Sequence, residues 1–416
     1  MSDWPKKITV NAAILVIVFG SSLPGSVGHL DAKESMDQWV GTWATAPMKA
    51  PVPQAGPAPD FDGSTLRQIV HVSVGGKRLR VKFSNAFGNG PLKLGAVHVA
   101  LSAGESTIKP ATDKPLTFNG QASATIPAGA PFVSDPIDFD LPPSGDLAIS
   151  MKLDTVPGDI TFHNASHATS YLGKANELSA PELASPKRIE HWYFLSAVDV
   201  EANRSAGAVV ALGDSITDGT ASATDKNHRW PDVLTRRLQA NKKLSHVGVL
   251  NLGIGGNRIL HDGTGESALA RLDRDVLAQS GVRYLIVLEG INDIGNNALA
   301  SSRGEEPVRA SDLIAAFEQI IARAHAHHVL VYGATILPFE GAKYYSQAGE
   351  ADREELNKWI RTSGKLDGFV DLDAATRDPQ NPLHLIKAAD SADHLHPADE
   401  GYRMMGDAAD LKLFSR

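Results

Sequence analysis

The chain has 416 residues, of which 42% are hydrophobic and 21% are charged, a composition typical of globular proteins and a length that favours two domains. Its formal net charge of -8 argues against nucleic-acid binding, because contacts with phosphates require a clustered excess of Lys and Arg. It contains no cysteine, which excludes disulfides, a thiolate nucleophile and a lipid-modified N-terminal cysteine.

Residues 1–28 have the layout of a secretory signal peptide. Lys6 and Lys7 precede an apolar run over residues 8–20, and small residues follow at 26–28. This order is typical of export, and the run is shorter than the roughly 20 residues of a membrane-spanning helix. A permanent membrane anchor is therefore the less favoured alternative, and we expect a bacterial protein that is secreted or periplasmic. The absence of cysteine is compatible with bacterial export.

Residues 37–203 are expected to form an all-β domain. Short runs of alternating apolar and polar residues are separated by clusters of Gly, Pro and Asn. The runs cover residues 66–74, 78–85, 96–101, 146–153 and 191–200. Period-two alternation with turn residues between the runs is typical of half-buried antiparallel strands. The pattern predicts a β-sandwich that is jelly-roll-like.

Residues 204–416 follow a different pattern. Continuous apolar runs alternate with helical periodicity, and they cover residues 208–212, 247–251, 284–288, 329–333 and 369–372. One helix is expected around Trp230, with Pro231 in its first turn, and another is expected behind Ser311 as N-cap. Uniformly apolar strands that alternate with helices predict a parallel sheet covered on both faces, in a doubly wound α/β domain of roughly five strands.

Polar residues follow several of these predicted strands. Gly213-Asp214-Ser215 follows the first strand, "NLGIGGN" (251–257) ends the second, and "EGIND" (289–293) follows the third. A further polar segment, "DHLHPADEGY" (393–402), lies near the C-terminus. In such a sheet ligands bind outside the carboxyl ends of the strands, so we expect a functional site there.

These segments contain the parts that acyl transfer requires. A hydroxyl nucleophile needs a base, the base needs a carboxylate to fix its tautomer, and the oxyanion needs hydrogen-bond donors. Ser215 is the candidate nucleophile and His396 the candidate base. Asp393 lies three residues before His396, close enough to reach its Nδ1. The backbone N–H groups of Ser215 and Gly256 and the side-chain amide of Asn292 are the candidate oxyanion donors, and glycine at 256 lets the backbone approach a substrate closely.

The four segments resemble the conserved blocks of the SGNH (GDSL) hydrolase family of serine esterases. The serine, glycine, asparagine and histidine of that family match Ser215, Gly256, Asn292 and His396 in the same order, and the D-x-x-H block supplies Asp393. The resemblance covers about half of the chain. It implies a flavodoxin-like, three-layer α/β/α hydrolase domain that uses no cofactor and no metal.

Two smaller features bear on this resemblance. Ile216 stands where the family's G-D-S-L has leucine, which is a conservative change. The segment "WVGTWATAP" (39–47), followed by the β-rich half, also resembles an N-terminal domain found ahead of some bacterial family members.

Some of these residues have other interpretations. Ser215 is also suited to capping a helix. Gly255 competes with Gly256 as oxyanion donor, and His394 competes with His396 as base. The glycines do not continue into the dinucleotide-binding motif G-x-G-x-x-G, because Arg258 stands at the third glycine position.

Metal binding is the alternative for two histidine clusters. Asp393, His394 and His396 form one, but no further ligands stand at neighbouring strand ends in metal spacing. His325, His327 and His328 form the other, for which a solvated helix end is favoured.

Other polar and aromatic residues are expected to be structural. We expect Asp214 to hold the turn at Ser215 through backbone N–H groups and Glu289 to be a buried, paired carboxylate. The aromatic residues Trp39, Trp43, Trp192 and Tyr193 are expected in the core of the β domain rather than on a sugar-binding platform.

The sequence therefore predicts a secreted serine carboxylic ester hydrolase that works through an acyl-enzyme. Its expected partner is an ester substrate, either a glycan ester or a small acyl ester. Deacetylation of extracellular polysaccharide is one hypothesis, and the fold does not decide the substrate. A short-chain lipase or lysophospholipase is the alternative within the same chemistry, and a non-catalytic carbohydrate-binding protein is the alternative from another class.

Overall fold

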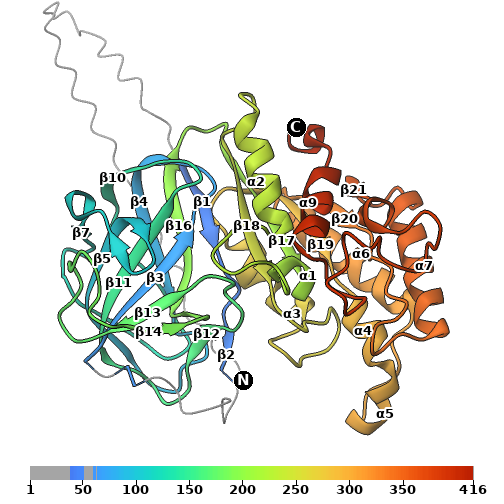
Figure 1. Cartoon of the computed structure of the whole chain (residues 1–416), viewed down its shortest axis with the longest axis horizontal. Helices are drawn as coiled ribbons and strands as arrows, with labels where there is room; N and C mark the ends of the chain where they lie inside the picture. Colours follow the sequence, from blue (N-terminus) through green and yellow to red (C-terminus); the bar gives the residue numbers. More distant parts are fainter. Residues whose placement is uncertain (1–37, 51–59, 62, 416) are drawn as a thin grey trace, which may run out of the picture. The chain divides into compact units, whose positions relative to one another are not determined.

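The computed structural model describes residues 38–50, 60–61 and 63–415 (Figure 1). The predicted signal peptide, residues 1–28, lies outside these described residues. None of the helices in the described part combines the length and the hydropathy that a membrane span requires.

The first half of the chain consists of antiparallel strands. They form two larger sheets and one small sheet. One large sheet has the order β1-β16-β4-β10 with β9 beside β4, the other has the order β14-β13-β3-β11-β5-β6 with β7 and β8 beside β5, and the small sheet has the order β15-β12-β2. The strands are β1 (Gln38–Ala44), β2 (Met48–Lys49), β3 (Thr65–His71), β4 (Gly76–Ser84), β5 (Leu92–Gly104), β6 (Thr107–Ile108), β7 (Lys114–Pro115), β8 (Ala124–Ile126), β9 (Pro131–Val133), β10 (Ile137–Leu141), β11 (Asp146–Thr155), β12 (Thr161–His163), β13 (Ser170–Gly173), β14 (Lys187–Ile189), β15 (Trp192–Tyr193) and β16 (Leu195–Ala202). The predicted all-β architecture of this half is confirmed.

One predicted strand of this half is wrong. The run at 191–200 is divided into β15 and β16 by Phe194, whose φ of 60° lies in the left-handed region. β15 pairs with β12, whereas β16 pairs with β1 and β4. The chain therefore changes sheets at Phe194, and the alternating pattern does not reveal this because side chains are buried on both sides of the break.

The second half of the chain contains the parallel sheet. Its strand order is β18-β17-β19-β20-β21, and all neighbouring strands run parallel. In chain order this is 2-1-3-4-5, the flavodoxin-like order. The strands are β17 (Gly207–Gly213), β18 (Val247–Gly253), β19 (Val282–Leu288), β20 (Leu330–Ala334) and β21 (Gly368–Val370). The predicted doubly wound α/β fold is confirmed.

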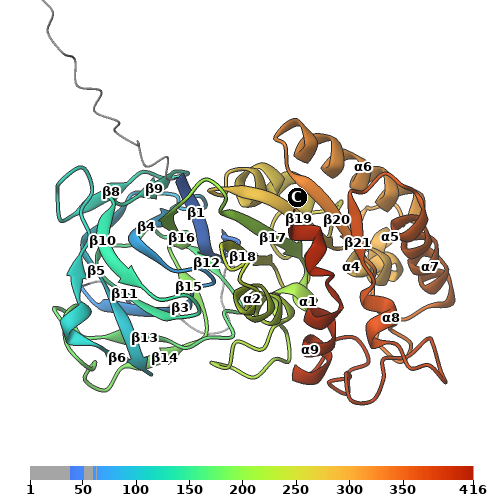
Figure 2. The same ribbon diagram turned by 90° about the horizontal axis from the view of Figure 1, so that it is seen from above.

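Helices cover both faces of this sheet. Figure 2 shows α2 and α9 on one side and α6 on the other. The helices are α1 (Ser215–Asp218), α2 (Trp230–Ala240), α3 (Ala268–Leu272), α4 (Ile291–Gly295), α5 (Ala300–Arg303), α6 (Ala310–Ala326), α7 (Gln347–Thr362), α8 (Leu372–Thr376) and α9 (Asp399–Ala408). The expected helix at Trp230 is present with Pro231 in its first turn.

The predicted N-cap of α6 is wrong. Helix α6 already begins at Ala310, so Ser311 lies inside its first turn, and Arg309 is the N-cap. The side chain of Asp312 accepts a hydrogen bond from the backbone N–H of Arg309 at 2.8 Å. A carboxylate at the third helical position thus binds the N-cap N–H, as in a capping box.

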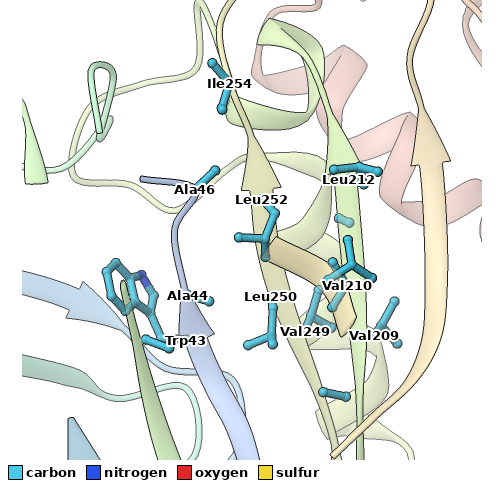
Figure 3. Packing of buried hydrophobic residues seen from close by; sticks show 14 of the residues in the cluster. Trp43, Ala44, Ala46, Val209, Val210, Leu212, Val249, Leu250, Leu252 and Ile254 are labelled. Atoms are coloured by element: carbon cyan, nitrogen blue, oxygen red, sulfur yellow. The ribbon is translucent and has the colours of Figure 1, made fainter. Parts of the chain in front are cut away.

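The antiparallel and parallel sheets share one apolar core. Strand β18 is the edge strand of the parallel sheet, and Ser73 of the β-rich half covers part of that edge by accepting a hydrogen bond from Val249 N at 3.0 Å. Strand β1 lies beside β18 (Figure 3), and a Cβ on Gly41 of β1 would lie 2.8 Å from the side chain of Leu250. An exposed strand edge invites pairing with other chains, so this contact protects the sheet while burying apolar surface. The described residues accordingly form one compact unit.

The domain boundary between residues 37–203 and 204–416 stays a prediction. The change from antiparallel to parallel pairing falls between β16 and β17.

Three of the four aromatic residues expected in the core are buried, and Trp43 packs edge-to-face on Trp192 with ring centroids 5.0 Å apart. Trp39 is half-buried beneath the guanidinium of Arg80.

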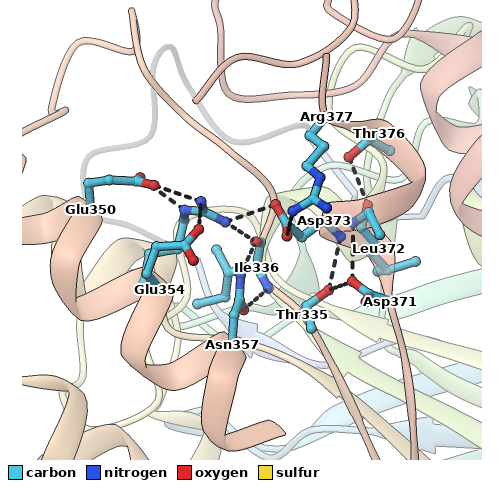
Figure 4. A network of polar contacts seen from close by, with 12 residues as sticks. Thr335, Ile336, Glu350, Glu354, Asn357, Asp371, Leu372, Asp373, Thr376 and Arg377 are labelled. Atoms are coloured by element: carbon cyan, nitrogen blue, oxygen red, sulfur yellow. Dashed lines mark hydrogen bonds and ion pairs between the residues drawn. The ribbon is translucent and has the colours of Figure 1, made fainter. Parts of the chain in front are cut away.

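A buried polar network fixes the chain where it leaves β20 (Figure 4). Asn357 of α7 binds both backbone groups of Ile336, accepting from its N–H at 2.7 Å and donating to its carbonyl at 2.8 Å. Arg353 donates to the same carbonyl at 2.9 Å and forms ion pairs with Glu350 and Asp373. Asp373 is also paired with Arg361 and Arg377, so removing the buried guanidinium of Arg353 leaves the carboxylate of Glu350 as the one without its countercharge.

We expect Arg353→Met to lower the free energy of unfolding by about 3 to 5 kcal/mol, the usual effect of breaking a buried ion pair from one side. Urea unfolding followed by circular dichroism measures this. The control is Arg403→Met, because Arg403 is exposed and pairs with Glu400 and Asp407 on the surface of α9, so its loss should change stability little. Equal unfolding midpoints for the two variants would contradict the structural role of the network.

Candidate functional site

The three strand ends that precede the candidate site lie in register. Gly213, the last residue of β17, is paired with Gly253 of β18 on one side and with Leu288 of β19 on the other. The segments that begin at Asp214, Ile254 and Glu289 therefore leave the sheet at the same edge. This edge lies at the switch point of the sheet, where the first strand has the second and third strands on its two sides.

Ser215 is the first residue of α1. Its neighbour Asp214 is the N-cap and accepts a hydrogen bond from Ile216 N at 2.8 Å, so the capping role belongs to Asp214 and leaves the serine hydroxyl available. Ser215 is 7% exposed, and its Oγ lies 2.8 Å from Nε2 of His396.

His396 is oriented by Asp393. The carboxylate of Asp393 lies 2.6 Å from Nδ1 of His396, and its second oxygen accepts the backbone N–H groups of His396 and Leu395 at 2.8 and 2.9 Å. Partial burial acts to raise the pKa of Asp393, but the hydrogen bonds from His396 and Leu395 outweigh it and lower the pKa to about 2. An ionised carboxylate accepts only, so it holds the proton on Nδ1 and leaves Nε2 as an acceptor for the serine hydroxyl.

His394, the rival base, has a different partner. Its Nδ1 lies 2.7 Å from a carboxylate oxygen of Asp390, and its side chain is 47% exposed. Among the hydrogen bonds of the described residues, none links His394 to Ser215. The structure thus brings His396, and not His394, to the serine.

The two rival glycines are distinguished by their hydrogen bonds. The N–H of Gly255 donates to Oδ2 of Asp218 at 3.0 Å and is therefore occupied. Gly256 has a φ of 77° in a turn closed by a bond from Asn257 N to Ile254 O at 3.0 Å, a conformation that favours glycine. Within the described part of the chain, no hydrogen bond uses the N–H of Gly256 or that of Ser215.

Asn292 follows β19 in helix α4, and its side-chain amide is held at two points. Nδ2 donates to the carbonyl of Asn257 at 2.9 Å, and Oδ1 accepts from the phenol of Tyr344 at 3.3 Å. The acceptor at Asn257 fixes which end of the amide is the nitrogen. Because Nδ2 carries two hydrogens, one N–H remains for a substrate oxygen.

Comparison with known proteins places these residues in a family. Residues 211–404 match the GDSL-like Lipase/Acylhydrolase family. The chain contains a domain of this family. The resemblance to SGNH (GDSL) hydrolases is thereby confirmed, and the matched segment, which we call the GDSL-like domain, includes all five predicted site residues.

Similar solved structures cover the same half of the chain. An acetyl xylan esterase from Geobacillus stearothermophilus has 22% identity and a TM-score of 0.39, with 50% of this chain and 96% of that chain covered. An alpha/beta hydrolase from the metagenome of Lake Arreo has 19% identity and a TM-score of 0.39, covering 50% and 96%. A protein of the G-D-S-L family of lipolytic proteins from Desulfitobacterium hafniense has 21% identity and a TM-score of 0.36, covering 48% and 96%. The comparison with curated proteins gave no match.

The GDSL-like domain places a cluster of buried charges behind the serine. Arg271 is fully buried, donates to the carbonyl of Gly213 at 3.0 Å, and forms ion pairs with Asp275 at 3.1 Å and Glu289 at 3.5 Å. Burial raises the pKa of Glu289 well above its usual range, and the nearby charge of Asp214 adds to this rise. Burial also raises the pKa of Asp214 to about 7, with the charges of Asp293 and Asp218 adding to the rise. Glu289 is thus the buried, paired carboxylate that was expected, while the sequence offered no motif that would reveal Arg271.

The two histidine clusters have other partners in the structure. His325 of α6 pairs with Asp367 at 2.8 Å, and His394 and His396 pair with separate aspartates. In the part of the chain that the structure describes, no group of three or more His, Asp or Glu side chains is arranged to hold a metal ion.

Sequence reasoning missed two residues whose contacts at the site join segments that are distant in the sequence. Tyr344 lies in the segment between β20 and α7, where "KYY" carries no signal of a site. Asp218 belongs to the segment "GDSITDG" but was not expected to bind the loop that contains Gly255. Only the folded chain brings these partners together.

Proposed function

We propose that this chain is a serine carboxylic ester hydrolase in which Ser215, His396 and Asp393 form a catalytic triad. One observation carries the proposal: Oγ of Ser215 lies 2.8 Å from Nε2 of His396, and Nδ1 of His396 lies 2.6 Å from Asp393. This is the order of contacts that activates a serine hydroxyl. The match of residues 211–404 to the GDSL-like Lipase/Acylhydrolase family supports hydrolysis as the reaction.

The proposed reaction has two halves. In the first, His396 takes the proton of Ser215, Oγ attacks the ester carbonyl carbon, and the tetrahedral intermediate collapses as His396 gives that proton to the leaving alcohol. The acyl group remains on Ser215. In the second half, His396 takes a proton from water, the resulting hydroxide attacks the acyl carbon, and the carboxylic acid leaves as Oγ regains its proton.

Three donors are proposed to bind the oxyanion of each intermediate. They are the N–H groups of Ser215 and Gly256 and the remaining N–H of Asn292. The support for this set is that the neighbouring Gly255 N–H is occupied by Asp218, whereas Nδ2 of Asn292 has a hydrogen to spare. Fixed donors of this kind stabilise developing charge without reorganisation during the reaction.

As a finer proposal, the substrate is an acetyl ester of an extracellular polysaccharide. The support is the expected export signal at residues 1–28 and the antiparallel half of the chain, which packs against the GDSL-like domain. We also propose that the mature protein is secreted or periplasmic. Short-chain or lysophospholipid esters remain the alternative substrates.

We expect Ser215→Ala and His396→Ala each to lower kcat by several orders of magnitude on a p-nitrophenyl ester, and the double variant to be little worse, because the two residues act as a unit. His394→Ala is the control, since this neighbouring histidine has its own carboxylate partner, and it should retain kcat. Strictly additive losses, or an equal loss in the control, would contradict the proposed triad.

We expect Asn292→Ala to lower kcat/KM by an amount that corresponds to about 3 kcal/mol of lost transition-state stabilisation. This is the usual effect of removing one oxyanion donor. Steady-state kinetics measure it, with thermal unfolding to verify the fold. A folded Asn292→Ala variant with wild-type kcat/KM would remove this residue from the oxyanion hole.

The substrate proposal predicts release of acetate from acetylated xylan by the wild-type protein and not by Ser215→Ala. Hydrolysis of a lysophospholipid is measured in parallel. Activity on the lipid alone would overturn the polysaccharide proposal and leave the triad intact. If a serine-directed phosphonate also failed to label the protein, the non-catalytic carbohydrate-binding alternative would be supported instead.

A further inference from the structure

A buried histidine from the β-rich half reaches the helix that begins at Ser215. His163 is the last residue of β12 and is 2% exposed. Its Nε2 lies 2.9 Å from Oδ1 of Asp218, which is the last residue of α1 and also 2% exposed. The two residues are 55 positions apart in sequence, so only the packing of the two halves joins them.

The contacts of His163 define its protonation. Nδ1 lies 2.9 Å from the carbonyl oxygen of Ala46, and Nε2 faces the carboxylate of Asp218. A carbonyl and an ionised carboxylate are both acceptors, so each ring nitrogen must carry a hydrogen and the ring is an imidazolium. Burial acts to lower the pKa of His163, but the charge and hydrogen bond of Asp218 outweigh it and raise the pKa. Arg229, the other nearby cation, has its own partner in Asp232.

The second oxygen of Asp218 continues the connection to the site. Oδ2 accepts the N–H of Gly255 at 3.0 Å, and Gly255 directly precedes the proposed oxyanion donor Gly256. The packing around Asp218 is close: a Cβ on Gly253 would lie 2.2 Å from its backbone nitrogen. A shift of the Asp218 carboxylate would therefore be transmitted to the turn that contains Gly255 and Gly256.

We propose that His163 is a positioning residue of the active site. Through Asp218 it holds the Gly255–Gly256 turn, so that the Gly256 N–H points at the oxyanion. This inference rests on the proposed hydrolase function. It makes the β-rich half a component of the catalytic unit, because His163 and its second partner, Ala46, both belong to that half. Removal of the imidazolium would take away the hydrogen-bonded countercharge of the buried Asp218 carboxylate and its link to the β-rich half, so that the carboxylate can shift.

The test compares His163→Ala and His163→Gln with a matched control in the full chain. Gln retains an N–H for Asp218 but no charge. The control is His98→Ala, because His98 of β5 also pairs with an aspartate, Asp113, at 3.0 Å but within the β-rich half. We expect His163→Ala to lower kcat on p-nitrophenyl acetate by about 10- to 100-fold with KM changed less than about twofold, since small misplacement of a catalytic group has effects of this size. His163→Gln should recover part of kcat, and His98→Ala should match the wild type.

A double variant separates positioning from general damage. If His163 acts through Asp218, its loss should matter little once Asp218 is gone. The kcat of the double variant His163→Ala/Asp218→Ala should therefore be less than about twofold below that of Asp218→Ala alone. Circular dichroism and thermal unfolding verify each fold, and His163→Gln replaces His163→Ala in both comparisons if the alanine variant does not fold. The proposal is overturned if the folded His163 variants have the kcat of His98→Ala, or if their loss of kcat is undiminished in the Asp218→Ala background. A separate result would overturn the hydrolase proposal itself: the wild-type protein would hydrolyse no ester, or Ser215→Ala would leave its hydrolysis unchanged.

Discussion

Parallel strands that end in the same register deliver their following residues to one edge of the sheet, and the whole candidate site depends on this constraint. Gly213, Gly253 and Leu288 form one row across β18, β17 and β19. The three segments that leave this row carry Ser215, the Gly255–Gly256 turn and Asn292. A slip of one strand along its neighbour would move a donor about 3.3 Å along the sheet, more than a hydrogen bond tolerates.

The C-terminal segment adds the histidine to this edge. A short loop is enough to bring Asp393 and His396 together, because the carboxylate of Asp393 binds both the ring and the backbone N–H of His396. Their spacing therefore makes the pair a local unit that is positioned as a whole. Behind the serine, Arg271 binds the carbonyl of Gly213 and compensates the buried carboxylates around it. Arg271 thus supplies a countercharge at this edge, although burial still raises the pKa of Glu289 well above its usual range.

Much of the fold could be predicted because its signals are local. Continuous apolar runs identified the parallel strands, and alternating runs identified the antiparallel ones, since burial on two faces or one face sets these periods. The candidate site residues could be singled out in the sequence because each follows a strand or lies in a short motif. The break at Phe194 and the true start of α6 were missed, because both depend on backbone conformation and capping that the apolar pattern does not record.

The contacts of His163, Asp218 and Tyr344 were missed for a different reason. Each joins segments that are far apart in the sequence, and none belongs to a motif of regular spacing. The packing of β1 against β18 has the same origin, because it requires two halves with different patterns to share one core. Such contacts decide how rigidly the proposed donors are held, and they become visible only in the folded chain.

The most direct test of the account is a crystal structure of the protein after reaction with a serine-directed phosphonate, whose tetrahedral phosphorus mimics the intermediate. We expect the phosphorus on Oγ of Ser215, with one oxygen about 2.7 to 3.1 Å from the N–H nitrogens of Ser215 and Gly256 and from Nδ2 of Asn292. An adduct on another residue, or a phosphoryl oxygen that points away from these three donors, would contradict it.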